Sequence, residues 1–210
     1  MRHDLHIPGF AYDLRPVTLD DAEFIVQMRS DAEKTRFLHP IELTVEAQQE
    51  YLQQYFEREN DYYFVVERRS DKLREGLAGI YDLRLPARAA EWGRWILRPG
   101  SFAAVESALR IYEAAFERLQ LEEVCGHTFL DNKAVVSFHD RCGLERRAIL
   151  RDYYQINGQG YDVVEHVLRR QSWPRVRAML EPRARQIARR FEDLAAGDMA
   201  TDAVERASRP

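Results

Sequence analysis

Apolar residues along the chain recur with two different periods, one typical of helices and one typical of strands. Phe24, Ile25 and Met28 repeat at helical spacing behind a capping threonine and two acids at 18–21, whereas 61–67 (DYYFVVE) is aromatic and β-branched, as strands are. These patterns predict an α/β (α+β) chain. Its elements are a strand at 12–17, helices at 18–29 and from 44, strands at 61–67, 77–84 and 90–97, a helix at 101–119, a strand at 123–129, a helix at 132–141, and a hairpin of strands at 145–155 and 161–169.

The C-terminal region, residues 174–196, differs in composition from the rest. Its apolar residues keep a helical period, and six arginines lie among them. Pro182 lacks the amide that a helix interior needs, so it predicts two helices rather than one. Residues 197–210 are small and polar, which predicts a disordered tail. The arginines form either a solvated helix face or a contact with a membrane surface or with the second copy of a homodimer.

Length, charge and cysteine content narrow the class of protein. The chain has 210 residues, 45% of them hydrophobic, a net charge of −4 and two cysteines. This composition supports a folded core, contains no apolar run long enough to span a membrane, and argues against nucleic-acid binding. No apolar signal segment follows residues 1–4, and two cysteines make neither a disulfide framework nor a zinc site. We therefore expect a cytoplasmic protein without a metal.

One segment carries more chemistry than the rest, because it runs along a predicted strand into a short turn and then into a helix. The turn is 98–103 (RPGSFA), and it ends where free backbone amides and the helix dipole favour an anion. Gly100, Ser101 and Ala103 are small enough for a phosphate to approach the backbone, and Arg98 adds a cation. The alternative is an ordinary turn in which Ser101 caps the helix.

A second segment, 131–144 (DNKAVVSFHDRCGL), follows a strand about thirty residues later. Together the two segments resemble the GCN5-related N-acetyltransferase (GNAT) superfamily, in which one helix holds the pyrophosphate of coenzyme A and a later helix borders its pantetheine arm. Residues 14–22 and 90–93 (AEWG) match patterns frequent in the same family. The resemblance covers roughly 12–170. It implies one domain over 1–170, with a mixed, mostly antiparallel twisted sheet of about six or seven strands, about four helices, and a C-terminal helical extension.

The resemblance also implies acetyl-CoA as cosubstrate, bound between two splayed parallel strands near Ile96 and 125–128. The family loop reads Arg/Gln-x-x-Gly-x-Gly/Ala. The better register puts Ser101 at the first glycine; the other puts Gly100 there and leaves Phe102 where a small residue is expected. Asn132 either bonds the cofactor or caps its helix. The residues expected to bind the cofactor are Ile96, Leu97, Arg98, Gly100, Ser101, Phe102, Ala103 and Asn132.

Glu91 is the candidate base that removes a proton from the acceptor amine, since the family often has a catalytic carboxylate on this strand. Strand alternation is expected to place Glu91, Gly93 and Trp95 on one face. The alternative role for Glu91 is a structural ion pair with an arginine, Arg94 or Arg15.

His139 is the candidate acid that protonates the departing thiolate, because it stands where the family usually has a tyrosine. An unperturbed histidine pKa of about 6.5 suits a proton shuttle at neutral pH. The alternative is that His139 only supports the site from the surface or from behind. Cys142, at the end of the same helix, is expected to pack rather than to act as a nucleophile.

The resemblance places the acceptor amine between the first two helices, their loop and the final hairpin. Arginines with aromatic rings suit a sugar or nucleotide as well as a peptide terminus. The pattern looks most like the branch that acetylates nucleotide-linked amino sugars, and the branch that modifies ribosomal-protein N-termini is also similar. A non-catalytic module that binds coenzyme A remains a further alternative. The candidate contacts are Arg29, Arg36, Phe37, His39, Tyr51, Tyr55, Tyr62, Tyr81, Tyr153 and Tyr154.

Overall fold

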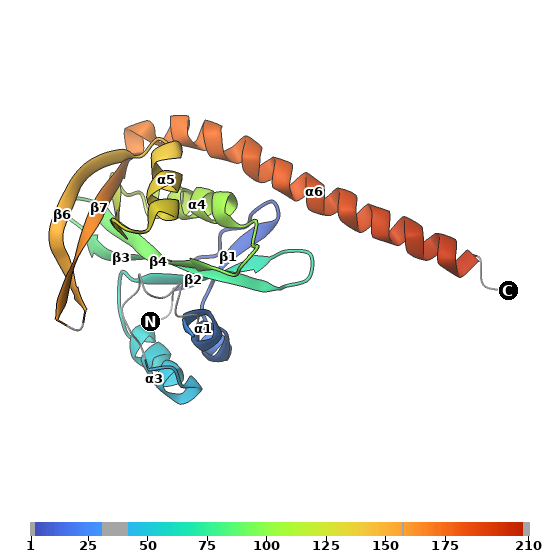
Figure 1. Ribbon diagram of the computed structural model, residues 1–210, viewed down its shortest axis with the longest axis horizontal. Coiled ribbons are helices and arrows are strands. Elements are labelled where there is room, and N and C mark those ends of the chain that lie inside the picture. The colour runs from blue at the N-terminus through green and yellow to red at the C-terminus, as the bar shows by residue number, and fades with distance from the viewer. Residues whose placement is uncertain (1–2, 31–41, 157, 208–210) are drawn as a thin grey trace.

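A twisted sheet of seven strands forms the centre of the fold in the computed structural model (Figure 1). The structure describes residues 3–30, 42–156 and 158–207, with side chains up to residue 193. The strand order is β1-β2-β3-β4-β5-β7-β6, which confirms the predicted sheet. The strands are β1 (Tyr12–Pro16), β2 (Tyr62–Arg68), β3 (Arg74–Arg84), β4 (Ala89–Leu97), β5 (Glu123–Phe129), β6 (Glu145–Ile156) and β7 (Gln159–Arg169).

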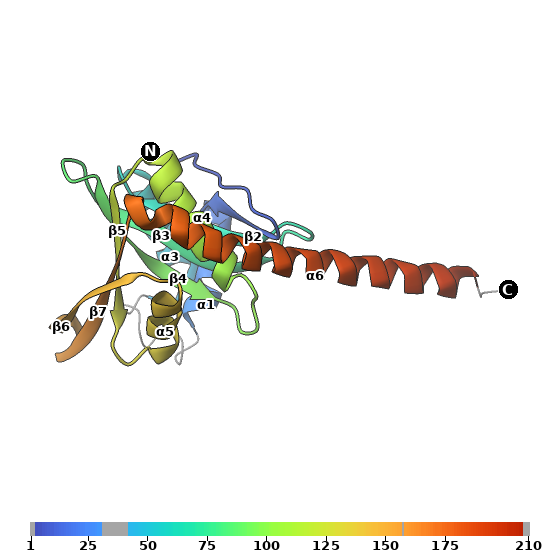
Figure 2. The ribbon, with the colours of Figure 1, turned by 90° about the horizontal axis from the view of Figure 1, so that it is seen from above.

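Helices cover both faces of the sheet. On one face lie α1 (Ala22–Arg29) and α3 (Val45–Phe56), while α4 (Ala104–Glu113), α5 (Lys133–Arg141) and the first half of α6 (Trp173–Ala207) lie on the other (Figures 1 and 2). A π-helical turn at Ala114–Arg118 continues α4. Apolar side chains of each layer form a separate buried cluster against the sheet. The two faces of the sheet are therefore covered by two separate apolar cores.

The pairing between β4 and β5 is the one parallel pairing in the sheet, and it is short. The paired residues are Ala89 with Glu123, Ala90 with Val124 and Glu91 with Cys125. Beyond Glu91 and Cys125 the described strands have no further pairs with each other, whereas β4 stays paired with β3 as far as Leu97. The two strands therefore separate at the positions where splayed strands were predicted.

A bulge in β4 changes the face on which its later side chains lie. Near Arg94 the strand places one more residue than β3 between two successive pairs, and Arg94 has a φ of +52°. A bulge of this kind reverses the alternation of side chains. Trp95 consequently lies against Trp92, with ring centroids 5.4 Å apart. The expectation that Trp95 shares a face with Glu91 and Gly93 is therefore wrong.

Helix α6 is one continuous helix with Pro182 inside it, so the prediction of two helices is wrong. It runs antiparallel along α4, since Trp173 lies 5.9 Å from the ring of Phe116 while Phe191 lies 6.1 Å from Phe102 (Figure 2). Packing of this kind stabilises a helix across an unfavourable residue. The side chains that α6 buries include Trp173, Val176, Leu180 and Ala184.

Contacts within the chain account for several arginines of α6. Arg177 pairs with Glu117 at 2.8 Å and with Glu181, while Arg185 also binds Glu181. Residues 197–207, predicted as part of a disordered tail, continue α6. None of the described helices, α6 included, is long and apolar enough to cross a membrane.

Candidate active site

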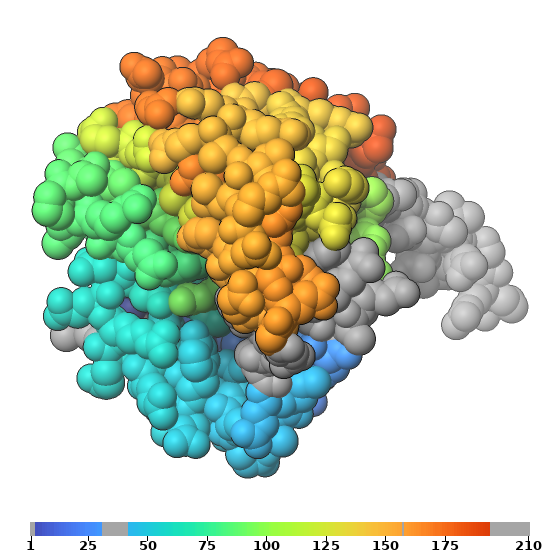
Figure 3. Space-filling view, turned by 60° about the vertical axis from the view of Figure 1, so that its left-hand side comes forward, coloured from blue at the N-terminus to red at the C-terminus, as the bar shows by residue number. Residues whose placement is uncertain are grey.

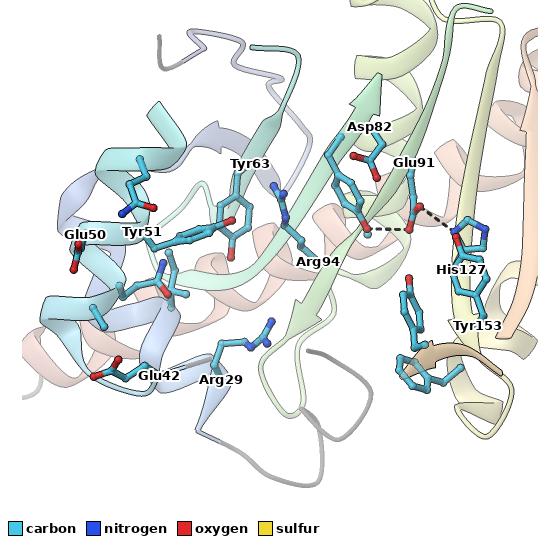
Figure 4. Close-up of a pocket in the computed structure, with 18 residues that line it drawn as sticks. Arg29, Glu42, Glu50, Tyr51, Tyr63, Asp82, Glu91, Arg94, His127 and Tyr153 are labelled. Atoms are coloured by element: carbon cyan, nitrogen blue, oxygen red, sulfur yellow. Dashed lines mark hydrogen bonds and ion pairs between the residues drawn. The ribbon is translucent and has the colours of Figure 1, made fainter. Parts of the chain in front are cut away.

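Two cavities, one on each face of the sheet, meet at the gap between β4 and β5. The larger cavity, of about 800 Å³, lies on the side of α1 and α3 (Figure 4). The smaller, of about 80 Å³, lies on the side of α5. Gly93, Arg94, His127 and Phe129 line both of them. A group held in one cavity can therefore meet a group held in the other through the sheet.

The turn between β4 and α4 keeps the features expected of an anion site. Gly100 has a φ of +74°, and among the described residues no side chain caps α4, whose N-cap is Ala103. The first amides of the helix therefore have neither a helical partner nor a side-chain cap. Ser101 does not cap α4, because its hydroxyl binds Glu75 and accepts the amide of Ala103 at 3.1 Å. The side chain of Phe102 is 60% exposed and leaves the turn open.

This arrangement favours one of the two registers considered for the loop. Ser101 and the buried Ala103 point inward at the two small positions, whereas Phe102 points outward at the variable position. Ser101 therefore fits the first glycine of the family pattern better than Gly100 does. Arg98 extends from the same turn, with its guanidinium 5.4 Å from the centre of the Phe24 ring.

The free edge of β4 and the start of α5 border the smaller cavity. Ile96 pairs with Leu77 on the β3 side, and its β5 side has no strand partner among the described residues. Such an edge can pair with an extended ligand. Asn132 caps α5 by accepting the amide of Val135 at 3.3 Å, and it also lines the smaller cavity. Both roles considered for Asn132 are thus compatible with its position.

His139 lies in the wall of the smaller cavity and is only 3% exposed. It packs against Trp92 and His166, with ring centroids 5.3 Å and 5.1 Å away. Burial, and then the neighbouring His166, lower the pKa of His139 to about 3. The ring is therefore neutral at pH 7, which corrects the expectation of an ordinary histidine pKa. Its buried Nδ1 has no hydrogen-bond partner within the described part of the chain.

Glu91 lies beside the gap and contacts a tyrosine and a histidine (Figure 4). The hydroxyl of Tyr81 donates to Oε1 at 3.0 Å, and Nδ1 of His127 lies 2.9 Å from Oε2. The two arginines considered as partners bind elsewhere: Arg94 pairs with Asp61 at 2.8 Å, and Arg15 pairs with Asp21 and Glu67. An ion pair between Glu91 and either arginine is therefore ruled out in this structure.

Gly93 explains how Tyr81 reaches Glu91. A Cβ atom at position 93 would lie 2.3 Å from the hydroxyl of Tyr81, which is closer than two such atoms can approach. A larger residue would push the tyrosine away from the carboxylate. The glycine in the AEWG segment therefore shapes the site itself.

His127 is a site residue that the sequence analysis missed. It stacks on Tyr153 at a centroid distance of 4.6 Å, and its Nε2 lies 3.7 Å from Oε1 of Glu165. Its place beside Glu91 follows from the β4–β5 register, in which Glu91 pairs with Cys125, two residues before His127. Only the register could have revealed this neighbour, since 36 positions separate His127 from Glu91 in the sequence.

Cys125 lies beside this pair, and burial raises the pKa of its thiol to about 11. The donor atoms of Glu91, Cys125 and His127 all lie within 4.8 Å of one another. In the part of the chain that the structure describes, this is the one group of such residues that is compact enough to hold a metal ion. The absence of a metal therefore stays a prediction, and Glu91, Cys125 and His127 are the residues at which metal binding can be tested.

The larger cavity lies between the helices α1 and α3 and the β6–β7 hairpin, whose tip faces those helices (Figure 3). Of the residues expected to contact the acceptor, Arg29, Tyr51, Tyr81, Tyr153 and Tyr154 line it. Tyr55 and Tyr62 are not among its lining residues, and Arg36, Phe37 and His39 lie outside the described residues. Charged residues missed by the sequence analysis also line it: Glu42, Glu50 and Asp82.

Comparison with known proteins agrees with this geometry. The family described as acetyltransferase (GNAT) domain matches residues 13–145. The uncharacterized N-acetyltransferase YoaA of Bacillus subtilis (strain 168) is 30% identical over 158 residues, which cover 71% of this chain and 88% of that protein.

Solved structures with similar folds include two acetyltransferases with different acceptors. Apo FdhC, a nucleotide-linked sugar GNAT, is 27% identical with a TM-score of 0.68, covering 84% of this chain and 97% of that one. Spermidine N-acetyltransferase from Vibrio cholerae, in complex with CoA and spermine, is 22% identical with a TM-score of 0.71, covering 78% and 98%. The family match across most of the sheet, together with strands that part between β4 and β5, shows that this chain belongs to the GNAT family of acetyltransferases, whose cosubstrate is acetyl-CoA.

Proposed function

We propose that the protein transfers the acetyl group of acetyl-CoA directly to the primary amine of a small molecule. The observation that supports this most is that the two cavities meet beside Glu91 and His127. The smaller cavity is lined by the diverging parts of β4 and β5 and by the start of α5, and the larger one by α1, α3 and several tyrosines. Two reactants held in this way can react without a covalent enzyme intermediate.

The residues around the smaller cavity fit acetyl-CoA. The uncapped amides of the first turn of α4, together with Arg98, would hold its pyrophosphate, and the free edge of β4 at Ile96 and Leu97 would pair with its extended arm. Asn132 and the unpartnered Nδ1 of His139 offer further polar contacts. When bound, acetyl-CoA supplies a thioester carbonyl as the electrophile.

Three groups of the chain carry the chemistry in this proposal. Glu91 removes a proton from the amine, directly or through a water molecule, while Tyr81 orients its carboxylate. A backbone amide of β4 at residues 95–97 stabilises the carbonyl oxygen as charge develops there. His139 donates a hydrogen bond to the departing sulfur as a neutral imidazole, because burial disfavours its protonated form.

A nucleotide-linked amino sugar is our first candidate for the acceptor. The larger cavity, of about 800 Å³, is large enough for such a ligand. Tyrosine rings stack on sugars and bases, and the side chain of Arg29 points into the cavity, where it can bind a phosphate (Figure 4). The tyrosines that line it are Tyr51, Tyr63, Tyr81, Tyr153 and Tyr154.

A cationic polyamine is the second candidate, and the charges in the cavity favour it. The carboxylates of Glu42, Glu50, Asp82 and Glu91 line the cavity, while one of its two arginines, Arg94, is already paired with Asp61. Carboxylates near tyrosine rings attract an extended chain of ammonium groups.

Incubation with acetyl-CoA and a panel of amino-sugar nucleotides, polyamines and peptides, followed by release of free thiol, identifies the acceptor. Arg29→Met is expected to raise KM at least 10-fold for a nucleotide sugar and to leave KM for a polyamine within about 2-fold. Glu50→Gln is expected to raise KM at least 10-fold for a polyamine and to leave KM for a nucleotide sugar within about 2-fold. Turnover of peptides alone would instead support a protein N-terminal acetyltransferase.

Glu91→Gln tests the base. Loss of a general base typically lowers kcat by about 10²–10⁴-fold, and the Kd of acetyl-CoA is expected to stay within 2-fold. Glu122→Gln is the matched control, because Glu122 is half exposed and forms surface ion pairs with Arg88 and Arg170. Full activity of Glu91→Gln would contradict the assignment. If millimolar acetyl-CoA failed to raise the unfolding temperature, the cofactor site itself would be excluded.

A further inference from the structure

We propose that the reacting amine enters from the larger cavity, which Glu91 and His127 both line, and contacts the two of them, and that Glu165 is a positioning residue that holds His127 in place for it. His127 would then contact the substrate, while Glu165 acts through His127. This inference rests on the proposed function, and it names residues of the acceptor site that neither the family match nor the relatives specify.

His127 lies where this role requires, beside Glu91 and at the junction of the two cavities. Its side chain is 7% exposed and lines both cavities, and its Nδ1 lies 2.9 Å from Oε2 of Glu91. This nitrogen has no aligned hydrogen-bond partner among the described residues. Leaving a buried polar atom unpaired costs about 1–3 kcal/mol, so a donor that enters from the cavity is its natural partner.

The imidazole is held on its face and at its far nitrogen. The ring of Tyr153 stacks on it at 4.6 Å and 24°, and Oε1 of Glu165 lies 3.7 Å from Nε2. Glu165 is held in turn by Arg147, whose guanidinium lies 3.6 Å away. When Glu165 occupies the Nε2 side, Nδ1 is left to face Glu91 and the cavity.

Negative charge predominates among the groups that surround His127. The carboxylates of Glu91 and Glu165 lie at its two nitrogens, and Arg147 is shared between Glu165 and Glu123. A positive charge that develops on the amine or the imidazole is therefore stabilised there. The titratable and charged residues near His127 on the strands packed around it are Tyr81, Asp82 and Arg84 on β3, Glu91 on β4, Cys125 on β5, Arg147 and Tyr153 on β6, and Glu165 on β7.

The arrangement balances the protons of the reaction. An ammonium group carries three N–H donors, and two of them can point to Oε2 of Glu91 and Nδ1 of His127. One proton passes to this pair, and the freed lone pair forms the new N–C bond. As the C–S bond breaks, the nitrogen loses its second proton, and that proton is transferred to the departing sulfur, which leaves as the free thiol. The proton held by the pair then returns to solvent.

Glu165→Gln is the first test, with Glu145→Gln as its matched control. Glu145 is an exposed carboxylate on the neighbouring strand and pairs with Arg169. We expect Glu165→Gln to lower kcat about 10-fold without changing the Kd of acetyl-CoA. The negative charge of Glu165 stabilises the protonated form of the Glu91–His127 pair. Its removal is therefore expected to move the acidic limb of the pH–rate profile to lower pH. A purely structural role would lower the rate at every pH and leave the limb in place.

Glu165→Asp and His127→Gln complete the kinetic test. The aspartate keeps the charge and is expected to restore the position of the acidic limb, even if the rate stays low. His127→Gln is expected to raise the KM of the acceptor and to lower kcat, since the contact with the substrate itself is lost. Circular dichroism of each variant shows whether it folds like the wild type.

Nitrogen NMR of the imidazole rings gives a readout independent of turnover. The His127 signals, assigned by their loss in His127→Gln, are expected to shift when the acceptor saturates the protein and to change in Glu165→Gln. Saturation by the acceptor without such a shift would overturn the proposal. If Glu165→Gln and His127→Gln kept full activity while Glu91→Gln lost it, this inference would fail and the proposed function would stand. Full activity in all three would contradict the proposed base as well.

Discussion

The indole nitrogen of Trp95 donates a hydrogen bond to the hydroxyl of Ser107 at 3.0 Å. Trp95 follows the bulge of β4, and Ser107 is a fully buried residue in the first turns of α4. Because the bulge turns the indole to this face, the bond ties the diverging end of β4 to the helix that follows the turn at 98–103. One contact thus fixes both the strand edge and the helix start that we assign to the cofactor.

Ser107→Ala is expected to loosen this end of β4. The variant leaves the indole N–H of Trp95 without its acceptor, which costs about 1–2 kcal/mol of unfolding free energy. We also expect the Kd of coenzyme A to rise several-fold, as measured by calorimetry beside urea unfolding. Ser30→Ala, at the exposed end of α1, serves as the control. Unchanged stability and affinity would show that the bond does not hold the strand.

Gly100 and Gly158 form a natural pair for testing the anion-binding turn. Both have positive φ angles, +74° and +77°, and a Cβ atom would meet nothing within 4 Å at either position. Alanine should therefore cost both variants a similar backbone strain of about 1 kcal/mol. Only Gly100→Ala is expected to raise the KM of acetyl-CoA. An equal effect from Gly158→Ala, in the hairpin turn, would refute a specific role for the turn at 98–103.

Much of the fold could be predicted from the sequence because local patterns determine it. The chain order of helices and strands and the parting of β4 and β5 follow from periodicity, turn chemistry and the family resemblance. Glu91 could be proposed as a site residue because the family often has a catalytic carboxylate on this strand. These features depend on neighbours in the sequence or on a pattern shared by the family.

The features that the sequence did not reveal depend on contacts between distant residues. The bulge that turns Trp95 is a property of the pairing with β3, and His127 joins Glu91 only through strand register. Pro182 breaks a helix in isolation, but the packing of α6 on α4 overrides that preference. The lowered pKa of His139 likewise follows from burial, which a sequence position alone does not show.

Acid is expected to destabilise the protein through His139. Its pKa in the folded state, about 3, lies below the value of about 6.5 for the unfolded chain, so folding favours the neutral ring. The stability from this difference is fully present above pH 6.5 and is lost as the pH falls toward 3. Each pKa unit corresponds to about 1.4 kcal/mol.

Urea unfolding measured between pH 7.5 and pH 4 checks this prediction. His139→Phe is expected to lose less stability over this range than the wild type does, because it has no buried ring to protonate. An identical pH dependence in His139→Phe and wild type would show that His139 contributes nothing to it.

Pro182→Ala is expected to stabilise α6 without changing activity. The alanine restores a backbone amide in the helix interior, where proline costs up to about 3 kcal/mol. Pro174→Ala is the matched control, since a proline in the first turn of a helix loses no hydrogen bond. A higher unfolding temperature only for Pro182→Ala confirms the difference, and a lower one would mean that the helix needs the proline at this point.

The short pairing between β4 and β5 gives the sheet an incomplete seam. Within the sheet, three residue pairs join strands β1 to β4 to strands β5 to β7. A ligand that lies along the open part of the seam adds backbone hydrogen bonds that the polypeptide alone does not make. Under the proposed function, the arm of the cosubstrate would complete this seam while it is bound, so the sheet would be more rigid with the cosubstrate than without it.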